Sequence, residues 1–425
     1  MKDRNLFSFL AGTMLLAATA MISSCTGEDG EGVGYLGDYV TDASDSYSFS
    51  SGKGGVGSGG DSVTDDEVNN VAAGVITAAE WSDLNYWPFW SKLMLGDTYS
   101  EKSEYWQFFT NNRVAVEVTD MSGRALAGIS VKLIRNDNTL WEAVTDNHGK
   151  AECWVGLTQK ETAGNTSLSL NIDGHVMAGA PVICPWDSQQ GETKGTEMVD
   201  GKYINRYSIS PSKTASQKAD IAFIVDATGS MADEINFLKS DLDDIISKAA
   251  SVRSELTFRT AALFYRDEGD DYLTRHSDFT EILSDTRLFV AQQSAQGGGD
   301  YPEAVHSALE GMLQNLSWDT SARTRLAFLI LDAPAHHEAD VMRSLQNSVT
   351  LCARMGIRII PVASSGVDKN TEFMLRFFAV ATGGTYVFLT DDSGVGNSHI
   401  EASVGPHKVE LLNSLIIRLI GLYTE

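Results

Sequence analysis

The sequence has 425 residues and a mass of 46.0 kDa, long enough for two or three domains with buried cores. It carries 57 acidic residues against 32 Lys and Arg, which gives a formal net charge of −25. This charge repels phosphate backbones, and no basic stripe offsets it locally, so the composition argues against nucleic-acid binding. Four cysteines without a Cys-x-x-Cys pair exclude a zinc ribbon and a dithiol redox motif.

The first 25 residues have the composition of an export signal. Two basic residues within the first four precede an apolar run from Leu6 to Ile22, which is short for a membrane span. The run ends at Ile22-Ser-Ser-Cys25, which resembles a bacterial lipobox, whose cysteine is acylated and becomes the new N-terminus. An ordinary signal peptide is the alternative. We expect residues 1–25 to be a lipoprotein signal peptide, with Cys25 lipidated, for example by palmitate, and the mature protein anchored in the outer membrane.

A Gly-, Ser- and Asp-rich stretch follows over residues 26–68. It contains Ser51-Gly-Lys-Gly-Gly-Val-Gly-Ser-Gly-Gly60 and offers almost no apolar surface for burial, so it predicts a flexible linker. The acidic residues just after Cys25 resemble the surface-export signals of Bacteroidetes lipoproteins. These residues do not decide whether the protein faces the periplasm or the cell surface.

Residues 69–112 form an unusually aromatic segment. Its aromatic residues include Trp81, Tyr86, Trp87, Phe89, Trp90, Tyr99, Tyr105 and Trp106. One interpretation is a platform on which sugar rings stack, which would make the protein a carbohydrate-binding surface lipoprotein. The other is a helical segment whose aromatic side chains cover a neighbouring domain, and the sequence favours this second interpretation.

From Arg113 onward the apolar residues alternate with period two in short segments separated by turns. The segments are 114–118, 129–134, 140–144 and 151–155. This pattern predicts an antiparallel β-sandwich over residues 113–190, and it resembles carboxypeptidase-regulatory or Ig-like modules, which implies a spacing or supporting role. Cys153 and Cys184 lie in this module, and an exported protein could join them in a disulfide, whereas Cys352 is expected to be a buried thiol.

The C-terminal part, residues 217–425, alternates apolar strands with amphipathic helices. The run Ile221–Val225 is apolar throughout, as expected of a strand buried on both faces of a parallel sheet. Further strands are expected at 260–264, 326–331, 357–362 and 385–389, and helices from the loop after Asp226 to about Arg253 and at 302–316, 339–355, 370–381 and 409–423. The pattern predicts an α/β fold with a doubly wound, mostly parallel sheet, in which ligands bind beyond the carboxyl ends of the central strands.

Two of these strands end on an aspartate, Asp226 and Asp332. Thr228 and Ser230 follow Asp226 at alternate positions, so their side chains can converge on one point. Carboxylates and hydroxyls form an all-oxygen set that suits Mg²⁺ or another hard divalent cation such as Mn²⁺ or Ca²⁺. Structural explanations also exist, because Asp is common in turns and Ser230 could cap the following helix together with Asp233.

The motif Asp226-Ala-Thr-Gly-Ser-Met231 resembles the opening of the metal-ion-dependent adhesion site (MIDAS) of von Willebrand factor type A (VWA) domains. Further landmarks resemble a bacterial subset similar to the VWA domains found beside alpha-kinases; they are Tyr265-Arg-Asp267, Gly297-Gly-Gly-Asp-Tyr-Pro-Glu-Ala-Val305, Trp318 and Asp332-Ala-Pro-Ala-His336. The resemblance implies a cation held by Asp226, Thr228, Ser230 and Asp332, and a protein partner whose carboxylate often completes the metal coordination. No Gly-rich phosphate loop or kinase motif accompanies these landmarks, so we expect no nucleotide.

The second loop departs from the family pattern. Many members supply a Thr there, whereas this sequence has Gly299-Asp300 before a helix predicted from Pro302. Asp300 is either a further cation ligand, an acceptor that supports the ligands, or a cap of that helix together with Glu303. A third carboxylate would bind the cation tightly and repel an acidic partner group, so we hypothesise a site that is structural or selects neutral ligands.

His336, His337 and Asp340 follow the second aspartate and suggest a metal-dependent hydrolase as a less favoured alternative. Adjacent residues of a helix point about 100° apart, so the two histidines rarely share a metal. The sequence contains no His-Glu-x-x-His motif. We therefore predict a protein that binds or adheres at the cell envelope and is not an enzyme.

Overall fold

The computed structural model describes residues 73–161, 167–184, 203–394 and 398–425. Cys25, the signal peptide and the linker predicted before residue 69 lie outside the described residues. Within the described ranges, no helix has both the length and the apolar composition that crossing a membrane would require.

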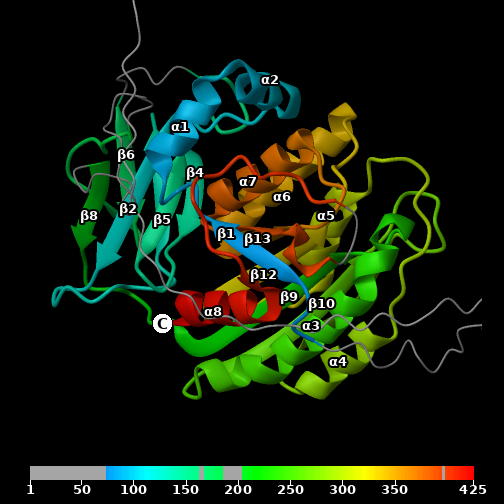
Figure 1. The fold of residues 1–425 in the computed structure, drawn as a ribbon. Coiled ribbons are helices and arrows are strands. Elements are labelled where there is room, and N and C mark those ends of the chain that lie inside the picture. Colours follow the sequence, from blue (N-terminus) through cyan, green and yellow to red (C-terminus); the bar gives the residue numbers. More distant parts are fainter. Residues whose placement is uncertain (1–72, 162–166, 185–202, 395–397) are drawn as a thin grey trace, which may run out of the picture. The chain divides into compact units, whose positions relative to one another are not determined.

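A mixed sheet of eight strands forms the centre of the C-terminal part (Figure 1). Its strand order is β11-β10-β9-β12-β13-β14-β1-β15. The five central strands β10, β9, β12, β13 and β14 run parallel, whereas β11, β1 and β15 are antiparallel to their neighbours. The strands are β1 (Thr77–Trp81), β9 (Ser216–Asp226), β10 (Thr257–Tyr265), β11 (Thr274–Thr280), β12 (Ala322–Leu331), β13 (Ile357–Ala363), β14 (Tyr386–Leu389) and β15 (Glu410–Leu411). The predicted doubly wound, mostly parallel α/β fold is confirmed.

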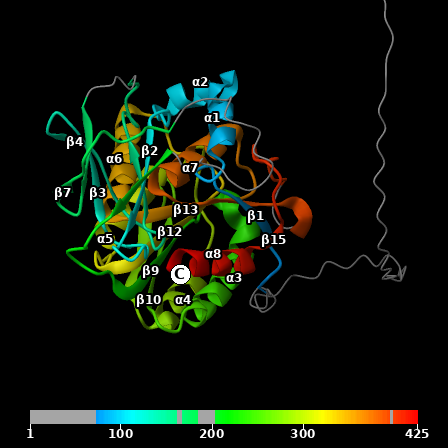
Figure 2. The same ribbon diagram turned by 90° about the vertical axis from the view of Figure 1, so that its left-hand side faces the viewer.

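Helices cover both faces of this sheet (Figures 1 and 2). One face packs on α3 (Ala232–Val252), α4 (Leu283–Ala291) and α8 (Leu412–Thr424), and the other on α5 (Val305–Asn315), α6 (Ala339–Met355) and α7 (Lys369–Thr382). Helix α6 has the predicted bounds, because its buried residues recur at helical spacing and Gly356, at φ +69°, ends it in the left-handed conformation. Strand β11 and helix α4 were not predicted.

Strand β1 extends the sheet from outside the range 217–425 predicted for the domain. It pairs antiparallel with β14, so that Ala79 lies opposite Phe388, and its other edge pairs with the short β15. A buried ion pair reinforces the connection, since Nε and Nη2 of Arg376 on α7 donate to the carboxylate of Asp83 at 2.8 and 2.6 Å. The segment before the β-strands of the middle region therefore belongs to the same core as the large sheet.

The aromatic segment forms helices α1 (Trp87–Leu95) and α2 (Asp97–Trp106), which pack against α7. The Trp90 ring lies 6.1 Å from that of Phe373, and Phe108 stacks on Phe377 at 3.7 Å. Trp81, Trp87, Trp90 and Trp106 are all buried. The interpretation of a sugar-binding platform is therefore wrong for these tryptophans, because their ring faces already pack in the core, and the covering role is the one observed.

Residues 113–208 contain two small sheets, which we call the β-module. One sheet has the order β5-β2-β8 and the other β4-β3-β6-β7; among the described strands of this module, only the β2–β8 pair is parallel. The strands are β2 (Arg113–Thr119), β3 (Ser130–Arg135), β4 (Asn138–Val144), β5 (Lys150–Trp154), β6 (Leu168–Ile172), β7 (His175–Val176) and β8 (Ile204–Ser208). The predicted strands β2 to β5 are present, and buried residues of both sheets belong to one core.

The candidate disulfide between Cys153 and Cys184 is not formed, since both residues are buried free thiols, as is Cys352. Cys153 lies opposite Val114 on the β5 side of β2, whereas the Cys184 N–H donates to the Arg113 carbonyl on the other side (2.8 Å). Strands about 4.8 Å apart place residues on either side of a third strand roughly 10 Å from each other. That separation exceeds the roughly 7 Å that a disulfide can bridge.

Candidate functional site

Asp226 and Asp332 lie at the same edge of the large sheet. Asp226 ends β9 and Asp332 directly follows β12, and these two strands are parallel neighbours in which Val225 lies opposite Ile330. Both aspartates are buried. The predicted convergence of the two carboxyl groups at the carboxyl ends of adjacent central strands is therefore present.

The loop after β9 brings two hydroxyls to the first aspartate. The Thr228 N–H and hydroxyl both donate to Asp226 Oδ1, at 2.8 and 2.7 Å, and Thr228 Oγ1 lies 3.1 Å from Ser230 Oγ. A short 3₁₀ turn over Gly229–Met231 sets this geometry. The N-cap of α3 is Met231 and makes no side-chain capping bond, so Ser230 does not cap the helix.

The two aspartates keep oxygens that nothing satisfies. Asp226 Oδ2 and Asp332 Oδ1 are buried and have no hydrogen-bond partner in the described part of the chain. Burial, followed by the charge of Asp332, raises the pKa of Asp226 to about 7, and burial raises the pKa of Asp332 to about 6. Unpaired buried carboxylate oxygens are costly, so the pair is a suitable place for a bound cation.

Glu303 places a further carboxyl group beside Thr228, although its position in the sequence predicts only a capping role. It is 2% exposed, its N–H donates to the Pro334 carbonyl (2.8 Å), and no partner in the described chain reaches its Oε2. A Cβ atom on Gly298 would lie 3.0 Å from Glu303 Oε1 and 3.3 Å from Thr228 Cβ, which places the carboxyl group beside Thr228. Burial and the charges of Asp226, Asp267 and Asp332 raise its pKa to about 9.

Asp300 differs from Glu303 in its surroundings. It is exposed, and α5 begins only at Val305 with Ala304 as its N-cap. Of the alternatives that the sequence left open for Asp300, capping of this helix together with Glu303 is therefore wrong. The quoted Gly297–Val305 motif contained both acidic residues, but its pattern fits a capping box as well as a binding loop, so only the structure distinguishes them.

The second loop is held close to the first by its glycines. The Gly229 N–H donates to the Gly297 carbonyl (2.9 Å), and the Gly298 N–H donates to Asp270 Oδ2 (2.8 Å). Gly297 has φ +82°, and a Cβ atom there would lie 2.2 Å from the Asp270 carboxylate. The left-handed conformation and this close approach favour glycine at position 297, and Gly298 is also left-handed at φ +72°, whereas no atom lies within 4 Å of a Cβ built on Gly299.

His336 and His337 contact different parts of the structure. His336 Nε2 lies 2.9 Å from Asp267 Oδ1, whereas His337 Nε2 lies 2.7 Å from the Tyr105 carbonyl and its ring stacks on Tyr105 at 3.6 Å. The hydrogen bond to Asp267 raises the pKa of His336 despite the opposing effect of burial. The side chains of these neighbours thus have separate partners.

No group of three or more His, Cys, Asp or Glu side chains is placed to hold a metal ion within the described ranges. The predicted ligand set depends instead on two carboxylates and two hydroxyls. Its unsatisfied oxygens and the Thr228–Asp226 bonds are what the chemistry of a hard cation requires. The residues present therefore fit such a cation.

Comparison with known proteins agrees with this fold. The model of the family described as von Willebrand factor A domain matches residues 220–390. A putative ariadne-like RING finger protein, R811, of Acanthamoeba polyphaga mimivirus is 30% identical over 189 residues, which are 40% of this chain and 18% of that protein. The alpha-protein kinase vwkA of Dictyostelium discoideum is 33% identical over 124 residues, which are 29% of this chain and 19% of the kinase. The chain thus spans less than a fifth of either relative.

Among solved structures, the chain is similar to the conserved hypothetical protein BatB of Bacteroides thetaiotaomicron, with 11% identity, a TM-score of 0.34, and coverage of 48% of this chain and 98% of that one. It is also similar to proximal thread matrix protein 1 of the mussel byssus, with 15% identity, a TM-score of 0.33, and coverage of 49% and 46%. The strand order, the position of Asp226 and the family match agree with one another. Residues 220–390 of this chain are therefore a von Willebrand factor A domain.

Proposed function

We propose that this protein is a lipid-anchored protein of a bacterial outer membrane whose VWA domain binds a hard divalent cation and, through it, a protein partner. Asp226, Thr228, Ser230 and Asp332 would hold the cation, and the protein would have no catalytic activity. One observation carries the proposal: two buried carboxyl groups from adjacent strands each keep an unsatisfied oxygen in the described structure. The anchor rests on the lipobox-like Ile22-Ser-Ser-Cys25 alone.

Glu303 supports a specific kind of partner. The Glu303 carboxyl group lies beside Thr228 and near enough to Asp226 and Asp332 for their charges to raise its pKa, although the described side chains contain no group of three carboxyls placed to hold a metal ion. Burial and the neighbouring aspartate charges raise the pKa of Glu303 to about 9 in the metal-free protein, and a bound dication would favour its ionised form. Ionised Glu303 beside the two ligating aspartates would leave the surroundings of the cation negative, which repels an acidic side chain by Coulomb interaction. We therefore propose that the partner offers a neutral oxygen, such as an amide or a hydroxyl, rather than a carboxylate.

Cation binding is tested by titrating Mg²⁺, Mn²⁺ or Ca²⁺ into metal-free protein and by following thermal unfolding. A ligand that binds only the native state adds about 2.7 kcal/mol of stability at a hundred times its Kd, so saturating Mg²⁺ should raise the Tm and EDTA should lower it. Asp226→Asn should abolish the effect, whereas Asp137→Asn, at an exposed turn of the β-module, should leave it unchanged. An identical Tm with Mg²⁺ and with EDTA would contradict the metal site.

Partner binding is tested by capturing envelope proteins on the immobilised protein with Mg²⁺ or with EDTA. A true partner should be retained only with Mg²⁺ and should be lost with Asp226→Asn. The anchor is tested separately, since Cys25→Ser should release the protein from the membrane fraction and prevent the incorporation of labelled palmitate. Metal-independent capture would refute the proposed mode of binding without affecting the anchor.

A further inference from the structure

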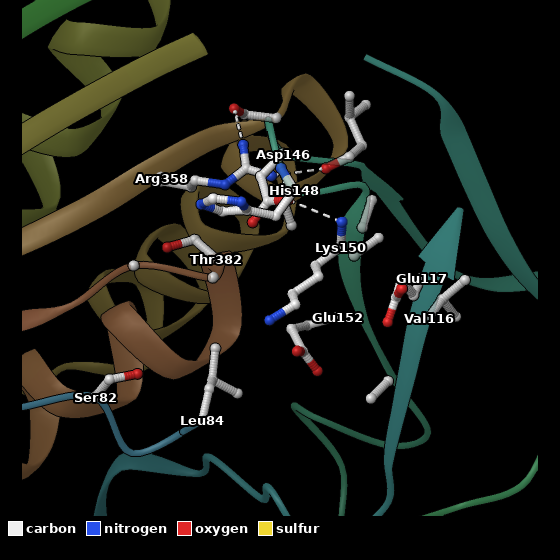
Figure 3. Close-up of a pocket in the computed structure, with 18 of the residues that line it drawn as sticks. Ser82, Leu84, Val116, Glu117, Asp146, His148, Lys150, Glu152, Arg358 and Thr382 are labelled. Carbon is white, nitrogen blue, oxygen red and sulfur yellow. Dashed lines mark hydrogen bonds between the residues drawn. The ribbon is translucent and has the colours of Figure 1, made fainter. Parts of the chain in front are cut away.

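A pocket of about 460 Å³ lies at the end of the large sheet opposite to Asp226 and Asp332 (Figure 3). Its lining includes Arg358 at the start of β13 and Thr385 just before β14, and therefore the amino ends of parallel strands. The β-module forms the facing wall with Lys150 and Glu152. A volume of this size lies within the range of roughly 300–1,000 Å³ that small-molecule sites occupy.

Three helices end at this pocket, and each end is already capped by a protein donor. Arg358 Nη1 donates to the Gly356 carbonyl after α6 (3.0 Å), and the Tyr423 hydroxyl donates to the Gly383 carbonyl after α7 (3.3 Å). In α8, the Leu422 carbonyl accepts from Asn147 Nδ2 (2.8 Å). Because protein donors already bond to carbonyls at these helix ends, the negative ends of the helix dipoles do not need a cationic ligand to stabilise them.

The carboxylates of the lining also have partners. Glu152 accepts from Nε and Nη2 of Arg113 at 2.6 and 2.7 Å, and Glu117 pairs with Arg206 at 3.3 Å. Asp146 Oδ1 accepts the backbone N–H groups of His148 and Lys150. Each acidic group of the wall is thus satisfied by the protein itself.

Two cationic groups remain without an acidic partner. The Lys150 ammonium forms no ion pair within the described chain, although Glu117 lies opposite it across the β2–β5 pair, and Figure 3 shows the lysine side chain extending into the pocket. Arg358 is 5% exposed, donates only to the neutral Gly356 and Val144 carbonyls, and keeps a buried Nε with no hydrogen-bond partner there. In a chain with a net charge of −25, this pocket is a local exception.

We propose that this pocket binds a small organic acid, whose carboxylate lies between the Lys150 ammonium and the Arg358 guanidinium. Leu84 and Ala115 line the pocket and would contact the apolar part of the ligand. A charge-assisted hydrogen bond to Lys150 and one to Arg358 would orient the carboxylate. The site is separate from the cation site of the VWA domain and needs no metal.

The test is calorimetric titration of the mature chain carrying Cys25→Ser with acetate, butyrate, hexanoate, succinate and glutarate, each compared with its amide. At least one acid should bind, and its amide should bind at least about tenfold more weakly. Lys150→Gln should weaken the acid by about tenfold, whereas Lys150→Arg should retain most of the affinity. Lys213→Gln, an exposed lysine outside the lining, is the matched control and should bind as the wild type does.

The proposal is overturned if no acid of the panel binds at up to about 10 mM. It is equally overturned if the amides bind as tightly as the acids, or if Lys150→Gln binds with unchanged affinity. A Mg²⁺ titration of Lys150→Gln keeps the two sites apart, because this exposed side chain lies at the other end of the sheet and its loss should leave cation binding intact. Failure here would leave the proposed cation site untouched.

Discussion

Glu303 and Asp300 lie three residues apart in one loop, yet the structure buries the first beside Thr228 and exposes the second. A bound dication favours the ionised form of Glu303, whose pKa is raised to about 9 without it, so replacing Glu303 should weaken cation binding more than replacing Asp300. We expect Glu303→Gln to raise the Kd for Mg²⁺ by about tenfold, and Asp300→Asn to change it by less than about twofold, because the Coulomb interaction falls with distance and with solvent exposure. Calorimetric Mg²⁺ titration of the two variants measures both values.

Each substitution keeps the size and shape of the side chain that it replaces, and both positions lie in the same loop, so the two Kd values differ only through the two carboxyl groups. Equal losses of affinity would show that the exposed carboxylate contributes as much as the buried one. A larger loss with Asp300→Asn would restore Asp300 as the cation ligand that the sequence left open.

Much of this site could be predicted at the residue scale. Asp226, Thr228, Ser230 and Asp332 follow apolar runs that are long enough to identify the strands, and the strand ends fix where those side chains meet. Glu303 could not be identified in this way, because the pattern Asp-x-x-Glu before a helix has an equally good local explanation. Its role depends on the contact with Pro334, which lies on a different loop.

At the scale of elements, β1 makes the large sheet dependent on a segment far away in sequence. The Thr77 carbonyl accepts the Thr390 N–H, so the backbone N–H and C=O groups of the odd-numbered residues of β1 point toward β14. Ala79 lies opposite Phe388 in this pairing. Proline at position 79 would remove a ladder donor in a buried strand. We expect Ala79→Pro to lower the free energy of unfolding by at least about 2 kcal/mol, because it leaves an unsatisfied buried acceptor.

Urea unfolding followed by circular dichroism measures this change. Ala73→Pro, at an exposed position before the strand, is the control and should remain within about 0.5 kcal/mol of the wild type. Equal stability of Ala79→Pro and the wild type would mean that β1 is not an integral part of the sheet.

The element scale also separates what the sequence could reveal from what it could not. The local pattern of apolar residues predicts a strand over Ile221–Val225 and a helix over Ala339–Met355, and the structure contains both elements. Strand β1 has only five residues, and its partners β14 and β15 lie more than 300 positions later, so no local pattern reveals the pairing. The aromatic segment beside it belongs to the core for the same non-local reason.

For the whole molecule, the buried carboxyl groups predict how stability depends on pH. The pKa values of Asp226 and Asp332, raised to about 7 and 6, exceed those of the unfolded chain, which lie near 4. Between about pH 4 and 7 the folded state therefore holds protons that the unfolded state has released, and the free energy of unfolding falls as the pH rises. Each proton so retained contributes a slope of about 1.4 kcal/mol per pH unit.

We therefore expect the Tm of metal-free protein in EDTA to fall between pH 5 and pH 8. Saturating Mg²⁺ should flatten this dependence, because the cation binds the ionised carboxylates and offsets their repulsion at the upper end of the range. Asp226→Asn should flatten the slope in EDTA as well, since it removes one of the protons that the native state retains. Asp241 and Glu303, whose pKa values burial raises to about 6 and about 9, supply a background slope in both proteins. A Tm in EDTA that rises over this range in the wild type, with the same slope in Asp226→Asn, would contradict the prediction. It would show that the native state does not retain protons on the two aspartates. Scanning calorimetry at several pH values distinguishes these outcomes.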